Sequence, residues 1–189
     1  MTRSTPAAAV ALVLLSLAVP RVHAQTSILV GVGSTFPVGT LTSSGPFAGA
    51  NAGWQGTIGL RRAIGTSGIA IGGRGFYGGN GYEGPGESES TLSGLAALGT
   101  WTLAQGPLSP LLWVEAGYFA HNYSSDSGGL LGGSTESSEQ AVLLAGGLGA
   151  SVPVGAAEIL VLGGYSHAVS VFDSIRYFIL TAALSLSLS

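Results

Sequence analysis

The last twelve residues of the chain, 178–189, alternate between two kinds of side chain. In an extended strand one face is apolar and the other mostly small or polar: Phe178, Leu180, Ala182, Leu184, Leu186 and Leu188 against Ile179, Thr181, Ala183, Ser185, Ser187 and Ser189. A helix would spread the leucines around its axis, because its period is 3.6 residues. An apolar strand with an unpaired edge is an aggregation hazard in water. In a closed barrel both edges are paired and the leucine face can meet lipid.

The chain carries too few charges to cover a soluble domain. Only 8% of its residues are charged, it has no lysine, and its mean hydropathy is +0.50, whereas soluble domains carry about 25% charged residues. A membrane helix needs about 20 apolar residues. The one candidate after residue 24 is 141–164, which contains Pro153, Glu158 and many glycines, and these residues disfavour a helix. The remaining class is a transmembrane β-barrel.

The first 24 residues have the pattern of a secretory signal peptide. Arg3 precedes an apolar core at 7–19, and Val22 and Ala24 occupy the small-residue positions before a cleavage site at Gln25. We therefore expect a signal peptide at 1–24 and one barrel domain at 25–189. The chain has no cysteine, so it has no disulfide framework and no cysteine-based metal site.

Eight alternating segments follow the signal peptide. They are residues 27–36, 53–62, 69–77, 91–103, 111–122, 141–152, 159–168 and 176–189. Their lengths are close to the 9–11 residues that a membrane-spanning strand needs. They predict an all-β, closed, antiparallel, eight-stranded up-and-down transmembrane β-barrel.

The connections between these segments alternate between long and short. The long ones are 37–52, 78–90, 123–140 and 169–175, and the short ones are 63–68, 104–110 and 153–158. Outer-membrane barrels have short periplasmic turns and longer extracellular loops, so the alternation predicts extracellular long loops and two periplasmic termini. Seven of the nine acidic residues fall in the long connections: Glu83, Glu87, Glu89, Asp126, Glu136, Glu139 and Asp173.

This pattern resembles the small eight-stranded outer-membrane β-barrel proteins of Gram-negative bacteria, over most of residues 25–189. The C-terminal strand is similar to the family's assembly signal, although that signal usually ends in an aromatic residue and this chain ends Leu188-Ser189. The resemblance implies a monomer in the cell outer membrane, without a cofactor. It also implies outer-membrane lipids, lipopolysaccharide and the barrel-assembly machinery as partners.

Strand parity assigns each side chain to the lumen or to lipid. The expected lumen residues are Gln55, Thr57, Gly59, Arg61, Ala70, Gly72, Arg74, Trp113, Glu115 and His121, and the expected lipid-facing ones are Trp54, Gly56, Ile58, Leu60, Ile69, Ile71, Leu112, Val114 and Tyr118. An arginine facing lipid at the bilayer midplane costs about 2–4 kcal/mol. We therefore expect Arg74 and Glu115 to face inward and to form an ion pair that plugs the lumen.

One polar cluster, Ser166, His167, Ser170 and Asp173, contains the residue types of a hydrolase: a hydroxyl, an imidazole base and an orienting carboxylate. The resemblance adds that some outer-membrane barrels are lipid A deacylases, with Ser and His two residues apart at the outer rim. Here His167 and Ser170 are three apart and Ser166 is adjacent to His167, so both serines face away from the imidazole in a regular strand. The sequence favours a rim histidine over a catalytic one.

Other site types lack support in the sequence. Glu83, Glu87 and Glu89 do not have the spacing of a calcium loop, so no metal site is predicted. From residue 25 on, nine acidic residues oppose four arginines, and nucleic-acid binding would need a basic surface. We expect a structural or surface-interaction role without catalysis. The alternatives are a rim hydrolase acting on outer-membrane lipid, a small porin-like pore, and a soluble periplasmic barrel that binds an apolar ligand.

Overall fold

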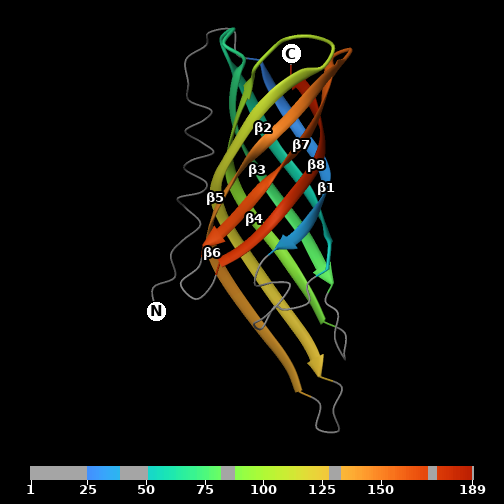
Figure 1. The fold of residues 1–189 in the computed structure, drawn as a ribbon, viewed down its shortest axis with the longest axis vertical. Coiled ribbons are helices and arrows are strands. Elements are labelled where there is room, and N and C mark those ends of the chain that lie inside the picture. Colours follow the sequence, from blue (N-terminus) through green and yellow to red (C-terminus); the bar gives the residue numbers. More distant parts are fainter. Residues whose placement is uncertain (1–24, 39–50, 82–87, 128–132, 170–173, 189) are drawn as a thin grey trace.

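A computed structural model describes residues 25–38, 51–81, 88–127, 133–169 and 174–188. These residues form a closed barrel of eight antiparallel strands in chain order (Figure 1). The strands are β1 (Thr26–Val38), β2 (Gly53–Ile64), β3 (Ile69–Gly81), β4 (Ser88–Thr102), β5 (Ser109–Ser127), β6 (Gly133–Val154), β7 (Ala157–Val169) and β8 (Ser174–Leu188). The predicted fold is confirmed, and each predicted segment overlaps one strand. The described residues include no helix long and apolar enough to cross a membrane.

The barrel closes through the pairing of its first and last strands. β1 pairs with β8 from Thr26↔Leu188 to Val38↔Arg176, so the alternating C-terminal segment is paired on both edges, with β7 on its other side. The predicted short connections are present. Gly155 occupies the two-residue turn between β6 and β7 with φ +63°, and Gly65 and Gly68 support the β2–β3 turn with φ +57° and +74°. The C-terminal end lies beside these short turns (Figure 1).

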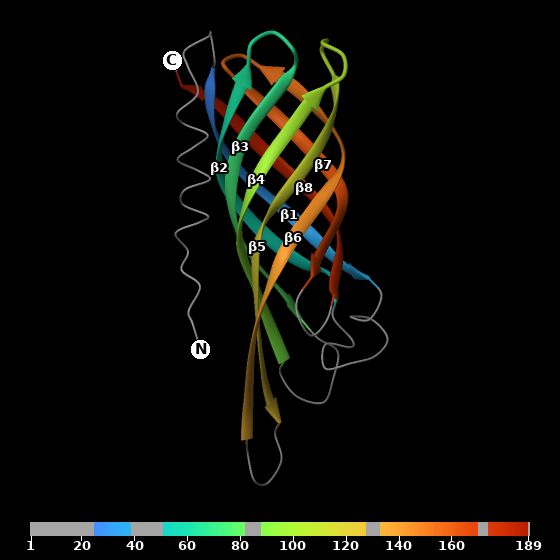
Figure 2. The ribbon, with the colours of Figure 1, turned by 90° about the vertical axis from the view of Figure 1, so that its left-hand side faces the viewer.

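The third long connection is shorter than predicted, because β5 and β6 continue as a paired hairpin. The sequence predicted a loop over 123–140, but β5 and β6 pair from Tyr123↔Ser137 to Ser127↔Gly133. Figure 2 shows both strands reaching beyond the rest of the barrel. Serine and glycine dominate this stretch, so it has no alternation of apolar residues. Polar strands can pair without such an alternation, because the hydrogen bonds between their backbones hold them together.

The barrel wall is apolar on its outside. The side chains of Val32, Leu148, Ile58 and Val114 are 70%, 67%, 64% and 63% exposed. Leu180, Leu184 and Leu186 of β8 also face outward, while Thr181, Ala183 and Ser185 between them are buried. Burial agrees with strand parity where it is decisive: Trp54, Ile58 and Val114 are exposed, and Gln55, Thr57 and Trp113 are buried.

The inside of the barrel is filled largely with side chains. One buried apolar cluster lies toward the short turns and contains Leu29, Leu98, Leu111, Trp113, Leu160 and Leu162. A second lies farther along the strands and contains Phe76, Leu92, Ala96, Phe119, Ala141, Leu143, Ala168, Ile175, Tyr177 and Ile179. Along β5, Glu115 falls between Trp113 of the first cluster and Phe119 of the second. A polar layer therefore separates two apolar ones.

Trp113 fits inside this narrow barrel because glycine faces it. Its indole Nε1 donates a hydrogen bond to the Gly163 carbonyl oxygen on β7, at 3.2 Å. A Cβ atom added at Gly164 would lie 2.6 Å from Trp113 Cζ2 and would also contact the Gly146 carbonyl oxygen. Gly163 is the adjacent residue, and a Cβ atom there would meet nothing closer than 3.9 Å.

This difference predicts opposite outcomes for two neighbouring substitutions. Gly164→Ala should lower the free energy of unfolding by about 1–3 kcal/mol, because it overpacks the lumen. Gly163→Ala, on the outer face, should change it by no more than about 0.5 kcal/mol. Urea unfolding of both variants in detergent micelles measures the two values. Equal losses would contradict the assigned packing of Trp113.

Candidate functional site

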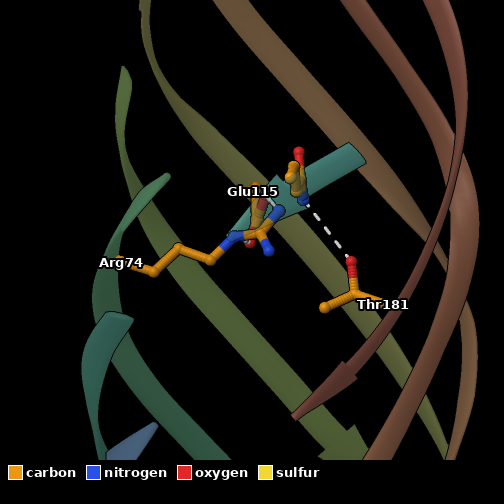
Figure 3. Close-up of polar contacts among 4 residues, drawn as sticks. Arg74, Glu115 and Thr181 are labelled. Carbon is orange, nitrogen blue, oxygen red and sulfur yellow. Dashed lines mark hydrogen bonds and ion pairs between the residues drawn. The ribbon is translucent and has the colours of Figure 1, made fainter. Parts of the chain in front are cut away.

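The polar layer of the lumen is built around an ion pair between β3 and β5. Arg74 Nη2 donates a hydrogen bond to Glu115 Oε2 at 2.7 Å, and Arg74 Nε contacts Glu115 Oε1 (Figure 3). The two side chains are 5% and 0% exposed. Arg74 is paired in register with Ala96 on β4, and this small side chain leaves room for the guanidinium to reach past β4 to β5. The structure thus brings together the two residues that the sequence placed in the lumen.

Neighbouring groups complete this layer. Gln55 Nε2 donates to Thr181 Oγ1 at 3.4 Å, which links β2 to β8 beside the ion pair (Figure 3). The Arg74 guanidinium carbon lies 5.8 Å from the centre of the Phe76 ring, within the range of a cation–π contact. The arginine thus contacts both oxygens of the carboxylate, and this two-point arrangement fixes the orientation of the two side chains.

A second ion pair lies near the short turns, and the sequence did not predict it. Arg61 of β2 contacts Glu158 of β7, with side chains 14% and 29% exposed. The pair borders a hollow of about 300 Å³ at this end of the barrel. Glu158 had been assigned to a turn, but β7 begins at Ala157. Strand parity with Leu160 and Leu162 was the signal that could have placed Glu158 on the lumen face.

The suspected hydrolase residues are divided by the barrel wall. Ser166 of β7 is buried in the lumen with 2% exposure. His167 lies on the outer face, paired in register with Leu144 on β6 and Arg176 on β8. The hydroxyl and the imidazole therefore point to opposite sides. Ser170 and Asp173 lie outside the described residues.

The acidic residues of the long connections are only partly described. Glu83, Glu87 and Asp173 lie outside the described residues, and only the backbone is described at Glu89, Asp126 and Glu136. Glu139 lies on β6, paired in register with His121, a lumen residue that is 1% exposed and stacks on Phe119. Where side chains are described, no group of three or more His, Asp or Glu residues could hold a metal ion.

The Arg74–Glu115 pair predicts a distinctive pattern of stability. Arg74→Met alone should lower the free energy of unfolding by about 3–5 kcal/mol, because it leaves a buried carboxylate without its cation. The double variant Arg74→Met/Glu115→Leu should lie much closer to the parent, since an apolar pair can replace a buried ion pair at little cost. Urea unfolding in detergent tests both. A double variant as unstable as the single one would show that the pair does not act as a unit.

Comparison with known proteins identifies the architecture. No protein-family model and no curated protein matches the sequence. Neisserial surface protein A is similar in structure, with a TM-score of 0.62, 15% identity, and coverage of 88% of this chain and 100% of that one. Ail of Yersinia pestis, in complex with the heparin analogue sucrose octasulfate, gives a TM-score of 0.59 at 12% identity, covering 88% and 100% of the two chains. The N-terminal β-barrel domain of Pseudomonas aeruginosa OprF gives 0.52 at 12% identity, covering 87% and 100%. The chain therefore has the fold of the small eight-stranded outer-membrane β-barrel proteins.

Proposed function

We propose that this chain is a non-conducting outer-membrane barrel whose projecting hairpin binds partners at the cell surface. Its apolar wall contacts outer-membrane lipids and lipopolysaccharide, its short turns and both termini face the periplasm, and the assembly machinery inserts it as a monomer. The observation that supports the binding role is an edge of β6, outside the closed part of the barrel, that no described strand covers.

The outer wall supports a membrane location. Monomeric soluble proteins rarely expose contiguous apolar patches larger than a few hundred Å², yet here apolar side chains face outward on every strand, among them Val30, Ile58, Ile69, Leu95, Val114, Leu148, Val161 and Leu184. A closed barrel satisfies its backbone groups internally, as lipid requires. The soluble alternative needs Leu184, Leu186 and Leu188 inside, but they are 40%, 43% and 49% exposed on the outside.

The filled lumen argues against a pore. Eight strands leave an interior just wide enough for side chains, and here two apolar clusters and the Arg74–Glu115 pair occupy it. The space that remains beside Arg74, Gln55 and Tyr177 is about 20 Å³, which holds about one water molecule.

The projecting hairpin offers an edge for a partner strand. β5 pairs with β6 as far as Ser127↔Gly133, but β6 pairs with β7 only from Val142↔Val169. In the described part of the chain, no strand pairs with the other edge of β6 over residues 133–141. At about 3.3 Å per residue this edge is roughly 30 Å long, and unpaired backbone groups can accept an added strand.

The charge of this projection indicates the kind of partner. Glu89, Asp126 and Glu136 lie on the outer parts of β4, β5 and β6. Acidic residues attract a basic surface and repel an acidic one. The structure of Ail contains a sulfated heparin analogue, whereas the acidic strands of this chain favour a basic peptide over a polyanion.

The membrane assignment predicts the behaviour of the protein during purification. It should leave the membrane fraction only with detergent, because the exposed wall needs a lipid-like solvent. It should migrate differently on a gel before and after boiling, and it should give no current steps in a planar bilayer. Release by salt alone without a mobility shift would overturn the membrane assignment. Regular current steps would contradict only the proposal that the filled lumen does not conduct ions.

The open edge predicts selective binding of a cationic strand. An extended peptide of alternating lysine and valine should bind the detergent-solubilised protein, and its glutamate–valine counterpart should not. Glu136→Gln should weaken binding by about threefold, a loss of about 0.7 kcal/mol. Glu158→Gln, at the opposite end of the barrel, is the control and should leave the affinity unchanged. Fluorescence anisotropy of the labelled peptides measures these affinities, and equal binding of both peptides would contradict the proposal.

A further inference from the structure

A groove of about 760 Å³ crosses the outside of the barrel wall over β1 to β5. It lies where outward positions carry little or no side chain, at Gly56, Gly75 and Ser93. Ile58 and Leu95 border it, and Trp54 and Tyr77 stand at one end. This groove is separate from the lumen and from the projecting hairpin.

The register of the strands explains the hollow. Gly56 pairs with Tyr77 and Ile58 pairs with Gly75, so each glycine lies beside a bulky residue of the next strand. Trp54 and Tyr77 meet edge to face, with ring centres 6.1 Å apart. A Cβ atom added at Gly56 would meet only the Tyr77 carbonyl oxygen, at 3.9 Å. The space above Gly56 is therefore open.

The residues that line the groove favour an apolar ligand. None of its lining residues is charged, so an ionic headgroup would lose hydration there without gaining a partner. From Trp54 to Ile58 the groove follows the strand for about 13 Å. The hydrocarbon layer of one leaflet is about 15 Å thick, half of the roughly 30 Å bilayer core. One extended alkyl chain matches both this length and this chemistry.

The aromatic end gives the orientation of the occupant. Trp54 and Tyr77 lie on the side of the barrel away from the short turns, and aromatic residues of membrane barrels gather at the interface with the headgroups. A chain that enters beside Trp54 and runs toward Ile58 descends from that interface toward the membrane interior.

We propose that this groove is a binding site for one saturated acyl chain of a membrane lipid in the leaflet next to the long connections. The inference rests on the proposed membrane location. It adds to that location a defined site, which should keep its lipid when bulk lipid is replaced by detergent.

Native mass spectrometry of the detergent-solubilised protein tests the site, with dimyristoyl phosphatidylcholine as the probe. The parent should bind one lipid, and Gly56→Leu should raise the dissociation constant at least about tenfold, because its side chain fills the groove. Gly163→Leu is the matched control. It is also an outward glycine with open space, with nothing closer than 3.9 Å to an added Cβ, but it lies on β7 and should leave the affinity unchanged. Gly56→Ala should have a smaller effect and serves if the leucine variant does not fold.

The outcomes separate this proposal from the membrane assignment. Binding that is unchanged in both Gly56 variants, or lowered equally by Gly163→Leu, would overturn the groove site. A dimeric mass that disappears in Gly56→Leu would overturn it in favour of a second copy as the occupant. The change in gel mobility on boiling is measured on the same samples, and its loss in the parent would instead contradict the membrane barrel itself.

Discussion

The pairing of β1 with β8 is the constraint on which the rest of the structure depends. It extends from Thr26↔Leu188 to Val38↔Arg176 and leaves the barrel without an open edge over that length. An apolar outer wall is compatible with lipid only when every backbone group has a partner inside the protein. Closure also fixes which side chains face outward and which face the lumen. A shift of the β8 register by one residue would turn its outward leucines into the lumen.

The features that the sequence predicted correctly are those that follow from the two-residue alternation of side chains along a strand. The strand positions, the two faces and the inward direction of Arg74 and Glu115 all follow from alternation, which a membrane wall imposes strictly. Two features did not follow from it. The β5–β6 extension is polar on both faces, so its strands have no alternating pattern. The contact between Arg61 and Glu158 depends on which strands lie close across the lumen, and no local pattern contains that information.

Glycine has opposite effects on the two sides of the wall. Inside, Gly164 makes room for a large side chain from another strand, so its small size increases packing. Outside, Gly56 faces no side chain that could fill the space, so the same residue type leaves the wall hollow. Composition alone cannot separate these roles. Outward glycines also make the surface of this wall uneven, whereas a wall with leucine at every outward position would be smoother.

The distribution of basic residues determines which reagents can detect the surface of this protein. From residue 25 on, its arginines are Arg61, Arg62, Arg74 and Arg176, all within hydrogen-bonded strands, and the chain has no lysine. Trypsin would therefore find no cleavage site in the connections of the folded barrel, and amine-reactive labels would find no side chain to modify. A surface survey with these two reagents would miss the protein even where it is abundant. Carboxylate-directed reagents and glutamate-specific proteases match its acidic connections instead.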